Sequence, residues 1–94
     1  MADSRTDTQT SEESSLDSIL SMRCRIDEID ALIIRLWQER ARLSQRIGKI
    51  RVAAGGTRLM LSREQEILDR FRGGIGTDGT QLALLVLRAG RGSL

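Results

Sequence analysis

Residues 16–53 read LDSILSMRCRIDEIDALIIRLWQERARLSQRIGKIRVA, and this stretch decides the fold. Its apolar residues recur at alternating steps of three and four, which is the spacing of one face of a helix. The chain contains no proline, and the stretch has no glycine before Gly48, so nothing in it interrupts a helix. The pattern predicts one helix from about residue 16 to residue 53. Its apolar seam comprises Ile19, Met22, Ile26, Ile29, Ile33, Leu36, Leu43, Ile47 and Ile50.

A helix of this length creates a packing problem. It would span ~57 Å at 1.5 Å per residue, which is too long for a compact domain of this size. Its seam must therefore pack against a second chain or against the folded-back remainder of its own chain. The composition, with 30% charged and 2% aromatic residues, favours an all-α fold.

Two shorter helices are predicted after the long one. Gly55 and Gly56 end the first helix, and a connector follows through Leu61. Ser62 and Gln65 have the form of a capping box for a short helix that ends at residues 73–74. A second box at residues 78–81 opens a final helix whose run LALLVL, residues 82–87, predicts that it is largely buried, and Gly90 ends it.

The two ends of the chain differ from its centre. Residues 1–15, MADSRTDTQTSEESS, have almost nothing to bury, and we expect a disordered tail outside a single domain of residues 16–94. No apolar run approaches the ~20 residues of a membrane span. The N-terminus lacks the basic-then-apolar pattern of a signal peptide, so we expect a cytoplasmic protein with no membrane partner.

The residue inventory excludes several kinds of chemistry. The chain has no histidine and one cysteine, Cys24, which leaves no ligand set for zinc, haem or an iron–sulfur cluster and no His-based catalytic triad. We expect neither a metal nor a cofactor. Acidic residues are interleaved along the long helix and no stacking aromatics occur, so we expect no nucleic-acid partner.

Arginine is the chemical resource that remains, and Arg40 is anomalous because it occupies a seam position. It either fixes the register of the packing or faces an internal polar cavity. Arg51 lies eleven residues further along nearly the same helix face, ~16 Å away, which leaves a gap suited to a small dianion. Arg23 lies well round the helix and would serve a partner chain's pocket. Arg63 and Glu64 follow the connector and could face the same gap. The alternative to a ligand-binding role for these charged residues is an ordinary surface ion pair.

These residues carry a resemblance to a known family. Residues 22–30, 39–41, 47–51 and 62–64 match in order the motif R-x-x-I-D-x-[IL]-D … E-R … [IV]-G-K-x-[KR] … R-E, which resembles the AroQ-type chorismate mutases. Residues 55–59 and 87–92 resemble the short intracellular actinobacterial branch. The resemblance implies a three-helix protomer with a long first helix, an intertwined homodimer, and rearrangement of chorismate to prephenate.

The resemblance also implies roles for individual residues. Arg40 and Arg63 would hold the substrate's carboxylates, and Arg23 would reach in from the other protomer. Arg51 would approach the breaking ether oxygen, and Glu64 would accept from the ring hydroxyl. Met60 occupies a substrate-binding position where relatives carry an acidic residue. The last helix has no Gln placed to bond the ether oxygen, and whether Arg91 replaces it is left open.

These departures imply weak activity alone and activation by docking onto DAHP synthase, which would reorder residues 90–94. The alternative is a non-catalytic helical dimer that acts as a regulatory partner.

Overall fold

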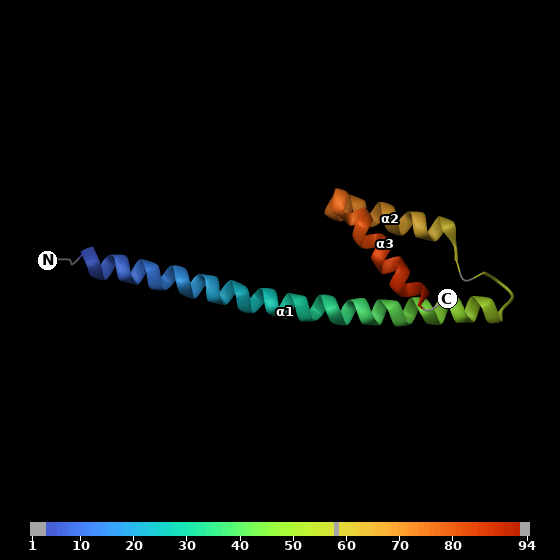
Figure 1. Ribbon diagram of the computed structural model, residues 1–94, viewed down its shortest axis with the longest axis horizontal. Helices are drawn as coiled ribbons and strands as arrows, with labels where there is room; N and C mark the ends of the chain where they lie inside the picture. Colours follow the sequence, from blue (N-terminus) through green and yellow to red (C-terminus); the bar gives the residue numbers. More distant parts are fainter. Residues whose placement is uncertain (1–3, 58, 93–94) are drawn as a thin grey trace. The chain divides into compact units, whose positions relative to one another are not determined.

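The structure is a computed structural model that describes residues 4–57 and 59–92. Those residues form three helices and no strand, namely α1 (Ser4–Ala53), α2 (Leu61–Ile75) and α3 (Thr77–Arg91) (Figure 1). The all-α, three-helix protomer with a long first helix is therefore confirmed. The chain divides into two units, the first ending at Ile34 and the second beginning at Arg35. None of the described helices is long and apolar enough to cross a membrane.

The first helix begins earlier than its apolar pattern predicts. The structure starts α1 at Ser4, not near residue 16. Periodicity reveals only a helix that has an apolar face, and residues 4–15 have none. They also contain no glycine or proline, and acidic residues near a helix start are stabilised by the helix dipole. The assignment of residues 1–15 to a tail outside the domain stays a prediction, and residues 1–3 lie outside the described part.

The end of α1 agrees with the sequence. The helix stops at Ala53, and Gly55 takes a φ of 86°, in the left-handed region that glycine adopts without a steric penalty. The amide of Gly56 then donates to the carbonyl oxygen of Arg51 at 2.8 Å, which satisfies one of the last free carbonyl groups. Arg58, in the connector, lies outside the described residues.

The two predicted capping boxes are wrong. Helix α2 begins at Leu61 after Met60, and α3 begins at Thr77 after Gly76, in neither case with a side-chain cap hydrogen bond. Gly76 alone separates the two helices, with a φ of 100°, so the chain reverses direction within one residue. The glycines at 73 and 74, predicted to end the second helix, lie inside α2.

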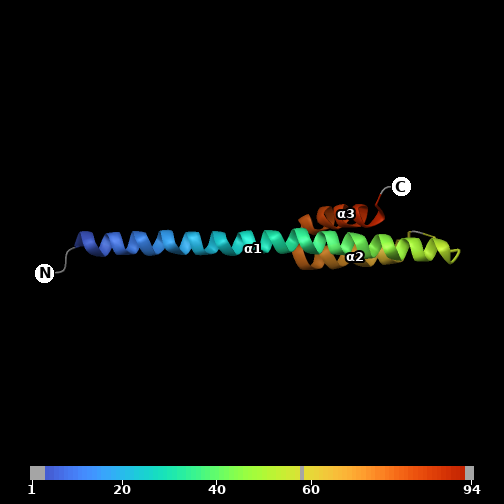
Figure 2. The ribbon, with the colours of Figure 1, turned by 90° about the horizontal axis from the view of Figure 1, so that it is seen from below.

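The core of the second unit lies between α2 and α3. Ile67, Ala83 and Leu87 are buried together, and Leu68 and Phe71 pack against them. From this core α3 returns toward α1, where the side chain of Gln45 donates to the carbonyl oxygen of Ala89 at 2.9 Å (Figures 1 and 2). Its last turn therefore lies against the C-terminal half of α1.

The final helix buries one face only, contrary to the prediction that it is largely buried. Ala83, Val86, Leu87 and two glycines are buried, but the side chains of Leu84 and Leu85 are about half exposed. The helix also continues through Gly90 to Arg91. Of the tail predicted at residues 90–94, the first two residues are therefore helical. Ser93 and Leu94 lie outside the described part.

Candidate active site

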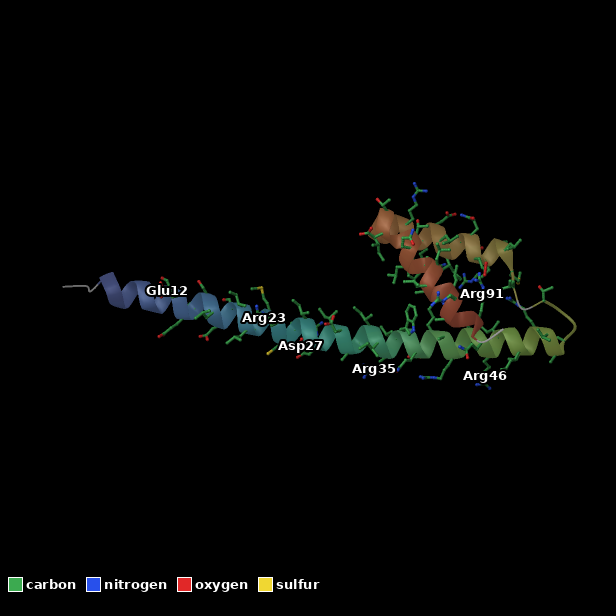
Figure 3. All side chains as sticks on the ribbon, in the orientation of Figure 1. Glu12, Arg23, Asp27, Arg35, Arg46 and Arg91 are labelled. Atoms are coloured by element: carbon green, nitrogen blue, oxygen red, sulfur yellow. The ribbon has the colours of Figure 1, made fainter. Side chains whose placement is uncertain are left out.

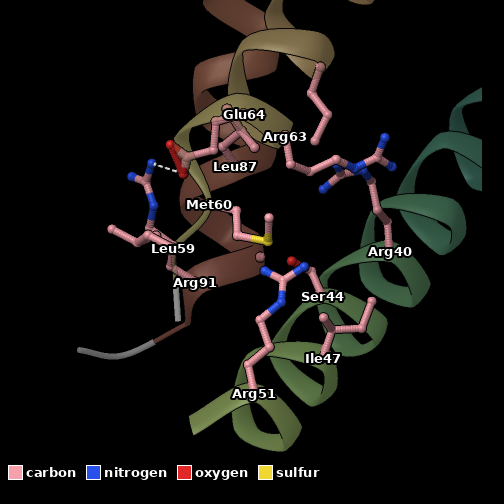
Figure 4. Close-up of a pocket in the computed structure, with 12 residues that line it drawn as sticks. Arg40, Ser44, Ile47, Arg51, Leu59, Met60, Arg63, Glu64, Leu87 and Arg91 are labelled. Atoms are coloured by element: carbon pink, nitrogen blue, oxygen red, sulfur yellow. Dashed lines mark hydrogen bonds and ion pairs between the residues drawn. The ribbon is translucent and has the colours of Figure 1, made fainter. Parts of the chain in front are cut away.

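A pocket of about 230 Å³ opens in the second unit, where three helices and the connector meet (Figure 4). Helix α1 contributes one wall, the connector and the start of α2 a second, and the end of α3 a third. Two core residues, Ile67 and Leu87, lie at its base. The lining comprises Arg40, Ser44, Ile47, Arg51, Leu59, Met60, Arg63, Glu64, Ile67, Leu87, Gly90 and Arg91.

Three arginines that were predicted as site residues line this pocket together. Arg40 and Arg51 come from α1 and Arg63 from the first turn of α2. Burial of Arg40 lowers the pKa of its guanidinium group, and the positive charges of Arg63 and Arg70 lower it further. Arginine still stays protonated at neutral pH. Like charges held this close repel one another, so the site favours an anionic ligand.

Nearby carboxylates neutralise little of the positive charge of Arg40, Arg51 and Arg63. Arg63 pairs with Glu66 at 3.1 Å, but both side chains are more than half exposed, so that pair is weak. Within the described part of the chain, neither Arg40 nor Arg51 lies within salt-bridge distance of a carboxylate. Of the two sequence interpretations of Arg40, the cation facing a polar cavity is the one that this geometry supports.

Glu64 is the acid of the pocket, and its partner is Arg91. Nη2 of Arg91 donates to Oε1 of Glu64 at 2.5 Å, joining the end of α3 to the start of α2. The amide of Glu64 donates to the carbonyl oxygen of Met60 at 3.0 Å, which fixes its backbone in the first turn. The ion pair lies on one side of the pocket and the guanidinium groups of Arg40 and Arg63 on the other (Figure 4).

The other two predicted site residues fare differently. Met60 lines the pocket and is 43% exposed (Figure 4). Arg23 belongs to the first unit, is exposed, and does not line the pocket. The described residues contain no cluster of His, Cys, Asp or Glu that could hold a metal ion.

Sequence reasoning missed Ser44 and Gly90, which meet at the pocket wall. Ser44 lies four residues after Arg40, on the same helix face, and that spacing could have identified it. Gly90 was assigned as a helix stop. It is instead buried inside α3, and a Cβ there would lie 2.6 Å from Oγ of Ser44. A glycine that permits a close approach has no distinct sequence signal next to one that ends a helix.

Comparison with known proteins identifies the family. The family model of type II chorismate mutases matches residues 22–83. The chain belongs to the type II chorismate mutase family. It is accordingly an isomerase that converts chorismate to prephenate, and the resemblance noted from its motifs is confirmed. The match also spans the three arginines and the glutamate of the pocket.

Individual chorismate mutases agree with this assignment. The intracellular chorismate mutase of Mycolicibacterium smegmatis is 49% identical over 73 residues, which cover 78% of this chain and 70% of that protein. The intracellular chorismate mutase of Mycobacterium tuberculosis is 46% identical over 83 residues, covering 88% and 78%. A solved chain is similar with a TM-score of 0.78 and 42% identity, over 85% of this chain and 96% of that one. It comes from a non-covalent complex of DAHP synthase and chorismate mutase from Corynebacterium glutamicum with a bound transition state analog.

Proposed function

We propose that the arginine-lined pocket of the second unit is where this mutase binds chorismate and rearranges it. The observation that carries the proposal is the set of three guanidinium groups, from Arg40, Arg51 and Arg63, around a cavity whose one acid is already paired with Arg91. Chorismate carries two carboxylates, so it supplies the negative charge that this site lacks.

The reaction makes few demands on the protein. It is an intramolecular rearrangement in which an ether C–O bond breaks and a C–C bond forms, with no net proton transfer. The site must hold the compact conformer of the substrate, which is an orientation effect. It must also stabilise the negative charge that develops on the ether oxygen, and a fixed cation out of bulk water does so efficiently. A chain without histidine has all that this chemistry needs.

We assign these tasks to four side chains of the pocket. Arg40 and Arg63, from two facing helices, hold the substrate carboxylates. Arg51 reaches into the pocket from a later turn of α1 and meets the ether oxygen (Figure 4). Glu64 accepts a hydrogen bond from the ring hydroxyl through the oxygen that Arg91 leaves free. These are the roles that the family motif implies for the same residues.

A charge-matched pair of variants tests this assignment. Arg40→Ala removes a pocket cation and should lower kcat/KM for chorismate by about 10²-fold or more. Arg46→Ala removes an exposed arginine that does not line the pocket and should change it less than about twofold. Figure 3 shows Arg46 on the side of α1 away from α3. Equal activity in the two variants, both folded, would contradict the assignment of the reaction to this pocket.

We propose further that the mutase is an intertwined homodimer. The seam residues of α1 are 38–61% exposed in one chain, from Ile29 at the lower end to Ile50 at the upper. An apolar face this continuous is covered in solution, and a seam with heptad spacing is suited to a second copy of itself. In such a dimer Arg23 of one protomer completes the pocket of the other, as the family resemblance implies.

Subunit mixing tests the shared pocket. Arg23→Ala and Arg40→Ala each disable both sites of their own homodimer. If each pocket takes Arg23 from one chain and Arg40 from the other, a mixed dimer has one intact pocket. Random exchange should then restore about a quarter of wild-type activity. A mixture that stays inactive while sedimentation shows dimers would mean that Arg23 serves the pocket of its own chain.

We also propose that the mutase works inside the cell and is activated by DAHP synthase. The support is the similarity to mutases named intracellular and to a chain solved in complex with that synthase. Met60 supplies no acceptor to a substrate hydroxyl, which is consistent with a weak enzyme alone. Adding the synthase should raise kcat/KM for chorismate. An unchanged kcat/KM at saturating synthase would contradict activation by this partner.

A further inference from the structure

The ion pair between Arg91 and Glu64 differs from the other salt bridges of the described chain. The side chains of Arg91 and Glu64 are 31% and 18% exposed, whereas those of Arg25–Glu28 and Arg63–Glu66 are all more than 50% exposed. The two exposed pairs join neighbours three residues apart on one helix. The Arg91 pair spans 27 residues and connects two helices across the wall of the pocket.

This pair is poorly explained as a device for stability. Taking both charges partly out of water is costly, and the attraction between them barely compensates for that cost. Nε of Arg91 is also buried with no hydrogen-bond partner, which adds a penalty that an arginine on the surface would avoid. An arrangement with these costs, placed at the edge of a reaction site, points to a role in the reaction.

We propose that Arg91 is a positioning residue, which holds the carboxylate of Glu64 in place to accept the hydrogen bond of the substrate hydroxyl. The inference rests on the proposed function of the pocket. Arg91 engages Oε1 of Glu64, and no second side chain of the described part donates to that carboxylate, so Oε2 is left free to accept a hydrogen bond from the ligand. The carboxylate of Glu64 is then held at two points, by its backbone in the first turn of α2 and by Arg91 at Oε1. These two points fix the direction in which Oε2 accepts.

The same contact keeps Glu64 away from the other cations of the pocket. A free carboxylate beside Arg40, Arg51 and Arg63 would pair with one of them and compete with the carboxylates of the substrate. Arg91 holds it from the opposite wall (Figure 4). The charges of Arg91 and Glu64 cancel, and three cations remain for two carboxylates and the charge that develops on the ether oxygen. Arg91 thus acts through Glu64 on both orientation and charge balance.

A double-mutant cycle tests the proposal on the full-length protein. Arg91→Gln keeps a polar side chain but loses the positive charge and the forked N–H donors of the guanidinium group. It should lower kcat/KM by about 10-fold to 100-fold. In a Glu64→Gln background the same change should cost less than about twofold, because the group on which Arg91 acts is gone. Arg91→Lys should recover part of the loss by restoring the charge.

The matched control is Arg88→Gln, which removes the charge of an exposed arginine on the same helix that does not line the pocket. It should leave kcat/KM within about twofold of wild type. Losses from Arg91→Gln and Glu64→Gln that multiply in the double variant would overturn the proposal, as would wild-type activity in Arg91→Gln. Wild-type activity in Arg40→Ala, by contrast, would refute the proposed function of the pocket itself. The two failures are therefore distinguishable.

Discussion

Gly90→Ala is the substitution for which the structure makes the sharpest quantitative prediction. The added methyl group would lie 2.6 Å from Oγ and 2.9 Å from Cβ of Ser44, and 3.7 Å from Nη1 of Arg40. The Cβ of Ser44 belongs to the stem of α1 and does not rotate away. Relief therefore requires a shift of about 0.5–1 Å between α3 and α1, at the point where Arg40 enters the pocket.

The magnitude follows from two opposing terms. Overpacking of this kind costs about 1–3 kcal/mol. Alanine in place of glycine inside a helix returns up to about 1 kcal/mol. We therefore expect a net loss of about 0–3 kcal/mol in the free energy of unfolding. The shift of α1 relative to α3 also displaces Arg40, which α1 carries. We therefore expect kcat/KM for chorismate to fall about 10-fold to 100-fold.

Two further variants isolate the cause. Gly74→Ala makes the same chemical change inside α2, where a Cβ would meet no atom within 4 Å, and should stabilise the protein by about 0.5–1 kcal/mol without loss of activity. Ser44→Gly combined with Gly90→Ala removes both close contacts and should recover most of the activity. Urea unfolding and chorismate turnover measure the two quantities. Wild-type turnover in Gly90→Ala alone would show that α1 and α3 do not approach this closely.

Three other predictions concern the packing and charge of the same unit. Gly79→Ala should destabilise the fold by about 3 kcal/mol or more, measured by urea unfolding, because its Cβ would lie 2.2 Å from the backbone carbonyl oxygen of Phe71. Arg51→Lys should keep kcat within about tenfold of wild type, whereas Arg51→Gln should lose about 10²–10³-fold, because charge at the ether oxygen matters more than the guanidinium fork. Raising the salt from about 0.05 M to 0.5 M should increase KM several-fold with little change in kcat, since screening weakens attraction of a dianion to arginines that are partly exposed.

The sequence predicted the parts of this structure that depend on a repeated pattern. The apolar seam from Ile19 to Ile50 identified the long helix, and the absence of histidine and proline limited both the chemistry and the fold. Arg40 and Arg51 were expected to lie together because spacing along one helix converts directly into a shared face, and both line the pocket. The family motif added Arg63 and Glu64 from the next helix and assigned the reaction.

The errors arose where a local signal had more than one physical meaning. Ser62 and Gln65 satisfy the pattern of a capping box, yet the observed N-cap is Met60, two residues earlier, and the box is unused. Gly90 was assigned as a stop signal but permits a close approach of two helices. The pair between Arg91 and Glu64 depends on a tertiary contact across 27 residues, which no periodic pattern encodes.

The exposure of the long helix and the composition of the pocket lead to one conclusion about how this small enzyme is built. Among the residues that the structure describes, one protomer buries four apolar side chains, those of Ile67, Ala83, Val86 and Leu87. That core positions Arg63, Glu64 and Arg91 relative to one another, because α2 and α3 form most of it. Arg40 and Arg51 are instead carried by α1, whose apolar seam remains exposed. The proposed dimer would therefore stabilise the wall of the pocket that bears these two arginines, and catalysis should be lost on dissociation even where α2 and α3 stay folded.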